Sequence, residues 1–198
     1  MLALAATLHW LTTAESCRDQ ETRFWIPFQT LHRWRVPTMK AIVKGLNNIR
    51  FPSNEEECAT ESRKWADLCP EFGKCLSAID GTFIPIVVPV DLQDRFRNRK
   101  GYTSFNVLIA ANVAAMITFI FPGVEGRASD GKVLLFSRLR EQIPEGFFVL
   151  ADAGYALTND VLTRFRGCRY HLKEFAAGAA APRNAEELYN LIHARCRM

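Results

Sequence analysis

The stretch Ala78-Ile79-Asp80-Gly81-Thr82 decides the fold of this chain. It leads into residues 83–88, Phe-Ile-Pro-Ile-Val-Val, a β-rich and almost wholly apolar run. A strand that is apolar on both faces is usually central in a covered sheet. We therefore expect Asp80 at or near a buried strand, where an ionised carboxylate is costly unless it is paired or bound to a metal ion.

A second stretch, residues 147–155, repeats this arrangement as Phe-Phe-Val-Leu-Ala-Asp-Ala-Gly-Tyr and contains Asp152. Two such carboxylates side by side make a site for a hard divalent cation. Each aspartate taken alone is equally consistent with the start of a turn or a helix cap. The repetition of the pattern after two β-rich runs favours the metal site.

Composition indicates a soluble globular chain, because 48% of its 198 residues are hydrophobic and 23% are charged. The net charge of +4 does not by itself identify a nucleic-acid partner. The longest apolar run, residues 107–121, contains Asn112 and is short for a membrane span. It predicts two buried strands around a turn, and we expect no membrane partner. None of the six cysteines forms a CxxC pair, which favours free thiols.

Residues 1–73 read as a helical N-terminal region. A turn near Ile26-Pro27, followed by a second helix from Gln29, gives a helix-turn-helix outline. Few basic residues follow that turn, so ordinary helical packing is as good an interpretation as DNA reading. A further helix, capped by Ser53 or Asn54, ends near Pro70.

The β-rich half spans residues 74–198, with strands predicted near 76–80, 82–88, 103–113, 115–121 and 146–151. A helix capped by Ser129 or Asp130 precedes the last of them. Three strands, a helix and a fourth strand are how an α/β ribonuclease-H-like core begins. In that arrangement the ends of the first and fourth strands are neighbours, which places Asp80 beside Asp152.

A basic run follows Asp80 within residues 94–102 and interleaves cations with aromatic residues. Its cations are Arg95, Arg97, Arg99 and Lys100. Cations and aromatics together suit contact with nucleic-acid phosphates. A solvated loop is the alternative, and the nearness of a candidate metal site favours phosphate contact.

Six motifs now occur in one order along the chain. They are Ala-Ile-Asp-Gly-Thr (78–82), Arg-Asn-Arg-Lys-Gly-Tyr (97–102), Gly-x-Glu-Gly-x-Ala-x-Asp (123–130), Leu-Ala-Asp-Ala-Gly-Tyr (150–155), Arg-Gly-Cys-Arg-Tyr-His-Leu-Lys-Glu (166–174) and Glu-Leu-Tyr-Asn (187–190). This ordered set resembles the DDE endonuclease domain of the Harbinger (PIF) transposases and of the nucleases derived from them. The resemblance covers residues 74–198 closely and the upstream helices more loosely.

The resemblance implies a ribonuclease-H-like nuclease that cuts DNA with two divalent metal ions, normally Mg²⁺ or else Mn²⁺. Asp80 matches the first acid of the family and Asp152 the second, so both are expected to be catalytic and to bind metal. Asp130 falls in another acidic motif, outside the three acids. The family further implies a nuclear protein with DNA as partner, often alongside a separate Myb-like DNA-binding protein.

The third acid of the family is a Glu on a helix shortly after the Glu-Leu-Tyr-Asn stretch, and residues 190–198 contain none. Glu186 and Glu187 match the segment before that helix, and an exposed helix start is the preferred interpretation of both. We therefore expect a core truncated before its last catalytic helix and an impaired endonuclease. The alternative is a non-catalytic remnant that binds DNA or protein. A two-carboxylate glycosidase is a more distant alternative, disfavoured by the basic run.

Overall fold

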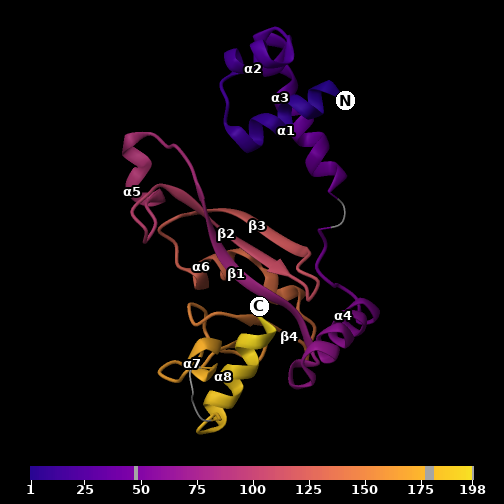
Figure 1. The fold of residues 1–198 in the computed structure, drawn as a ribbon, viewed down its shortest axis with the longest axis vertical. Coiled ribbons are helices and arrows are strands. Elements are labelled where there is room, and N and C mark those ends of the chain that lie inside the picture. Colours follow the sequence, from indigo (N-terminus) through magenta and orange to yellow (C-terminus); the bar gives the residue numbers. More distant parts are fainter. Residues whose placement is uncertain (47–48, 177–180, 198) are drawn as a thin grey trace. The chain divides into compact units, whose positions relative to one another are not determined.

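The computed structural model describes residues 1–46, 49–176 and 181–197 (Figure 1). The chain forms two compact units, residues 1–48 and residues 49–198. No helix within the described ranges is long and apolar enough to cross a membrane.

The first unit consists of α1 (Leu2–Thr13), α2 (Cys17–Phe24) and α3 (Phe28–Gly45). Its small core contains Ala6, Ile26 and Leu31, with Phe24 and Trp34 packed against them. Ser16 begins α2 by accepting the Asp19 N–H at 3.2 Å. The predicted succession of helix, turn and helix is therefore present, and α3 begins one residue earlier than expected.

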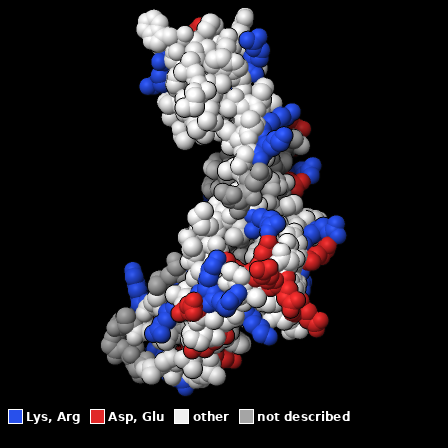
Figure 2. Space-filling view, turned by 90° about the vertical axis from the view of Figure 1, so that its right-hand side faces the viewer, with Lys and Arg blue, Asp and Glu red and all other residues white. Residues whose placement is uncertain are grey.

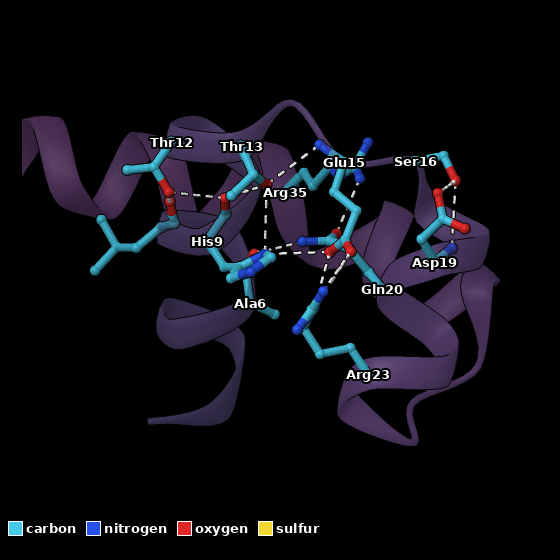
Figure 3. A network of polar contacts seen from close by, with 11 residues as sticks. Ala6, His9, Thr12, Thr13, Glu15, Ser16, Asp19, Gln20, Arg23 and Arg35 are labelled. Carbon is cyan, nitrogen blue, oxygen red and sulfur yellow. Dashed lines mark hydrogen bonds and ion pairs between the residues drawn. The ribbon is translucent and has the colours of Figure 1, made fainter.

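A polar network joins the three helices of this unit (Figure 3). The buried Gln20 donates from Nε2 to the Ala6 carbonyl at 3.0 Å and accepts from Arg35 Nη2 at 3.0 Å. The Arg35 guanidinium also lies 4.2 Å from the centre of the Trp10 ring. Arg35 thus stabilises the unit from within, although it is one of the few basic residues that follow the turn.

The second unit is built on a five-stranded sheet in the order β3-β2-β1-β4-β5 (Figure 1). The strands are β1 (Cys75–Pro85), β2 (Ser104–Ala111), β3 (Ile117–Glu125), β4 (Phe148–Ala151) and β5 (Val161–Thr163). Neighbours among β1, β2 and β3 are antiparallel, whereas β4 is parallel to β1 and β5 is parallel to β4. This is the predicted ribonuclease-H-like α/β fold, preceded by a helical region.

The helices of this unit are α4 (Glu55–Leu68), α5 (Gln93–Phe96), α6 (Asp130–Ser137), α7 (Leu172–Ala176) and α8 (Ala185–Cys196), with short 3₁₀ turns at Pro70–Phe72, Val90–Leu92 and Leu139–Gln142. Asn54 caps α4 and Asn184 caps α8, each accepting a backbone N–H at 2.8 Å. The sheet contributes to two apolar clusters. One includes Val133 of α6, and the other includes Trp65 of α4 and Cys196 of α8.

Helix α4 packs within the second unit, because Trp65 lies in the same apolar cluster as Cys75 and Leu150 of the sheet. The structural division at residues 48 and 49 therefore precedes α4. The domain boundary expected between residues 73 and 74 stays a prediction.

The expectation of a covered apolar strand after Asp80 is wrong. The buried part of β1 is Cys75–Ile79, whereas Ile84 is 50% exposed and Val87 is fully exposed. These residues are exposed because β1 loses one of its neighbours. Strand β4 pairs with β1 as far as Ala78, and beyond it only β2 pairs with β1, as far as Pro85. The second half of β1 therefore pairs on one side only, with β2, and its other side is an open edge of the sheet.

Candidate metal site at the ends of β1 and β4

The parallel pairing of β1 and β4 brings Asp80 and Asp152 together. Ala78 lies opposite Leu150 in this pairing, and each aspartate comes two residues later along its own chain segment. Asp80 is exposed, which corrects the expectation of a buried carboxylate, and Asp152 is half-buried. Asp80 Oδ1 accepts the Gly81 N–H at 2.9 Å, and Asp152 Oδ1 accepts the Gly154 N–H at 2.7 Å. Both carboxylates therefore lie at the same edge of the sheet.

A third carboxylate, that of Asp130 at the start of α6, reaches the same place. Its Oδ1 accepts the Asn106 amide at 3.1 Å and lies 2.7 Å from where a Cβ on Gly81 would stand. A Cβ on Gly154 would stand 3.0 Å from Asp130 Oδ2 and 2.9 Å from Asp152 Oδ1. The two glycines thus make room for Asp130, which the family resemblance left outside the three acids.

Asp130 and the Asp80 side chain lie on opposite faces of β1. Successive residues of a strand point to opposite faces, so the face of β1 that Gly81 presents to Asp130 is opposite to the Asp80 side chain. Asp130 and Asp152 meet beyond the end of β4, at Gly154. In the sequence, the room for Asp130 is indicated by the glycine that shortly follows each of the two predicted aspartates.

Two buried polar groups near the carboxylates have no hydrogen-bond partner among the described residues. They are Oδ1 of Asn106, which is fully buried, and the hydroxyl of Tyr155, which is 3% exposed. Burial raises the pKa of the Tyr155 hydroxyl far above its usual value, and the charges of Asp130, Asp80 and Asp152 raise it further. All three carboxylates therefore act on one buried phenol.

The chemistry of these groups fits a hard divalent cation, because carboxylate and amide oxygens are its preferred protein ligands. The unpartnered Asn106 oxygen faces the Gly81 position, 3.2 Å from a Cβ placed there. Within residues 1–46, 49–176 and 181–197, no three His, Cys, Asp or Glu side chains form a ready metal cluster. Asp80 and Asp152 each accept a glycine N–H through Oδ1, and the second oxygen of each carboxylate remains for an ion.

The basic run forms a defined loop around α5 with all four cations exposed. Asn98, 5% exposed, anchors this loop by donating to Ser104 Oγ and accepting the Lys100 N–H, both at 2.8 Å. Arg95 pairs with Glu125 at 2.5 Å, and Arg99 lies 5.7 Å from the centre of the Phe83 ring. Arg97 donates to the Gly101 carbonyl at 3.0 Å. Phosphate contact by Arg95, Arg97, Arg99 and Lys100 stays a prediction.

Lysine and arginine are mixed with aspartate and glutamate on the face of the second unit seen in Figure 2. The first unit is largely uncharged on the face seen there. The surplus of positive charge is therefore not gathered into one basic surface on this face, and any phosphate contact there rests on local groups.

Glu187 was expected at an exposed helix start, and the structure corrects this. It is 7% exposed and accepts Arg169 Nη2 at 2.6 Å and the Arg183 N–H at 2.9 Å. The hydrogen bond from Arg169 is the main reason that its pKa is lowered to about 2. Glu187 therefore fixes the start of α8 and is not placed at the carboxylate site.

We predict that Gly154→Ala weakens Mn²⁺ binding about tenfold or more, since supporting groups around metal ligands typically contribute that much. The new Cβ would press on both Asp152 and Asp130 at 2.9 and 3.0 Å. Isothermal titration calorimetry measures the change. The matched control is Gly131→Ala in α6, where the new Cβ would stand in open space. Equal affinity in the two variants would contradict the shared placement of the carboxylates.

Comparison with known proteins identifies the larger part of the second unit. The family model described as DDE superfamily endonuclease matches residues 79–198. A search of curated proteins and a search of solved structures each found no match. Endonucleases of this superfamily typically use divalent metal ions, in keeping with the oxygen ligands at the ends of β1 and β4. The family match covers more than half of the chain, and the chain therefore belongs to the DDE superfamily endonucleases.

Proposed function

We propose that this chain is a metal-dependent DNA endonuclease domain derived from a transposase, of the Harbinger kind. One observation carries the proposal: the parallel pairing of β1 and β4 sets Asp80 beside Asp152. Asp130 adds a third carboxylate at Gly154. The proposed ions are Mg²⁺ or Mn²⁺.

The chemistry suits hydrolysis of a phosphodiester bond. Bound divalent ions would activate the attacking oxygen and stabilise the leaving oxygen. Asp80 in β1 and Asp152 just after β4 would hold them, each two residues beyond the paired residues Ala78 and Leu150. Asn106 would orient Asp130 through its amide hydrogen bond.

The proposal includes DNA as the partner, with phosphates held by the basic run of residues 95–100, and the nucleus as location. A separate Myb-like protein would supply sequence-specific binding, as the resemblance to Harbinger transposases implies. We expect slow cutting by residues 1–198, because Asp130 approaches from the face of β1 opposite to the Asp80 side chain.

A second candidate function is that of a non-catalytic remnant that binds DNA or protein. It is favoured by the absence of a ready three-ligand cluster in the part of the chain that the structure describes.

Nicking of supercoiled plasmid in the presence of Mn²⁺ separates the two candidates. The endonuclease should convert supercoiled DNA slowly to the open-circular form, and EDTA should stop the conversion. Binding of the plasmid without any metal-dependent nicking would support the remnant. Electrophoretic mobility of the same samples at low salt reports the binding.

A further inference from the structure

Two arginines are tethered to the backbone next to the candidate metal aspartates. Arg197, at the end of α8, donates from Nη2 to the carbonyl of Ile79 at 3.0 Å, the residue before Asp80. Arg166, in the turn that follows β5, donates from Nη2 to the carbonyl of Ala153, the residue after Asp152. One guanidinium therefore stands beside each of the two strand ends.

The partners of these two arginines differ from those of the six arginines that form ion pairs. Arg23, Arg50, Arg95, Arg138, Arg140 and Arg169 form ion pairs with Asp or Glu. Among the described residues, neither Arg166 nor Arg197 lies within ion-pair distance of a carboxylate, and each makes one hydrogen bond, to a main-chain carbonyl. A guanidinium has five N–H donors. Most of the donors of both side chains therefore remain for a ligand.

The charge of Arg197 acts on the same buried hydroxyl, that of Tyr155, as the three carboxylates. The pKa of Tyr155, raised by burial and by Asp130, Asp80 and Asp152, is lowered in part by the charge of Arg197. The buried phenol thus lies close to both signs of charge. Arg197 is half-buried and Arg166 is exposed, so a ligand from solvent can reach the second directly.

A site of carboxylates alone repels a polyanion, and cations at its border remove that obstacle. The planar guanidinium matches two phosphate oxygens and keeps its charge at every working pH. The carbonyl tethers also fix where each guanidinium lies, which lowers the entropy lost on binding.

We propose that Arg166 and Arg197 form a phosphate clamp that holds the backbone of a DNA strand across the carboxylates of Asp80 and Asp152. This rests on the proposed endonuclease function and adds two positioning residues to it. The opposing interpretation is that both arginines are structural tethers, one for α8 and one for the loop after β4.

The test is the salt dependence of DNA binding without metal, measured by fluorescence anisotropy with a labelled duplex in EDTA. Each of Arg166→Gln and Arg197→Gln should lower the slope of log affinity against log salt by about 0.9, the value of one phosphate contact. Arg166→Lys and Arg197→Lys should keep the slope. The control is Arg63→Gln on α4, an exposed arginine that donates to the Ala59 carbonyl at 3.1 Å.

A second measurement separates clamping from tethering. Mn²⁺ binding without DNA should be as tight in Arg197→Gln as in the parent chain, or tighter, because a cation next to the carboxylates has been removed. Weaker Mn²⁺ binding together with an unchanged salt slope would show a structural tether and overturn the clamp.

Variants of the two aspartates show whether the clamp alone is wrong or the proposed function as well. If Asp80→Asn and Asp152→Asn weaken Mn²⁺ binding while both Gln variants keep the parent slope, the clamp is wrong and the metal site stands. If those aspartate variants leave Mn²⁺ binding unchanged, the proposed function fails, and the clamp that rests on it fails too. A parent chain that binds no DNA overturns both.

Discussion

Asp80→Asn is expected to weaken Mn²⁺ binding by more than about tenfold and to lower metal-dependent nicking at least about a hundredfold. The amide keeps the size of the side chain and removes the charge that attracts a dication. Asp80 is exposed and forms one hydrogen bond, to the Gly81 N–H, so the change should leave the fold intact. Calorimetry with Mn²⁺ and plasmid nicking measure the two effects.

Asp67→Asn is the matched control, since Asp67 is an exposed carboxylate on α4 and away from the strand ends. Asp152→Asn should match Asp80→Asn in both assays. Asp130→Asn should weaken Mn²⁺ binding as well, because it removes the carboxylate that faces Asp152 at Gly154. Parent-like Mn²⁺ affinity in Asp80→Asn would rule out its role as a metal ligand.

Unfolding is expected to become easier by about 3 kcal/mol as the pH falls from about 6.5 to about 4, because of His193. This residue of α8 is fully buried, with Nε2 3.2 Å from the Leu162 carbonyl and the ring stacked beside Tyr189. Burial is the main reason that the pKa of His193 is lowered from 6.5 to about 4. The folded chain keeps the ring neutral, whereas the unfolded chain protonates it first as the pH falls.

The stabilisation is therefore complete above about pH 6.5 and is lost progressively down to about pH 4. Urea unfolding at several pH values measures it, and His193→Gln should remove this part of the pH dependence. A proton NMR titration of the parent chain provides an independent check, since one of its four histidines should titrate near pH 4. A His193 resonance that titrates near 6.5 would contradict the prediction.

The sequence predicts those parts of the site that follow from a local pattern. A β-rich run ending in an aspartate occurs twice, and the strand order of the fold then places Asp80 beside Asp152. The exposure of Asp80 could not be predicted this way. It depends on where β4 stops pairing with β1, and the length of one strand is not visible in the sequence of its neighbour.

Long-range packing explains the remaining differences. Strand β5 has three residues and forms through its pairing with β4, so its own sequence carries little strand signal. Asp130 reaches the site because α6 packs against the sheet, and Arg197 reaches it because α8 does. Glu187 is buried because Arg169 from a preceding loop closes over it. Each of these placements requires residues that are distant along the chain.

The parallel pairing of β1 with β4 is expected to form late in folding. Parallel strands joined by most of a domain are slow to pair, because the long connection must close before the contacts form. A nascent chain that has emerged only as far as β3 contains Asp80 and two antiparallel hairpin contacts, without Asp130 or Asp152. Asp80 and Asp152 therefore come together only after the C-terminal strands have docked.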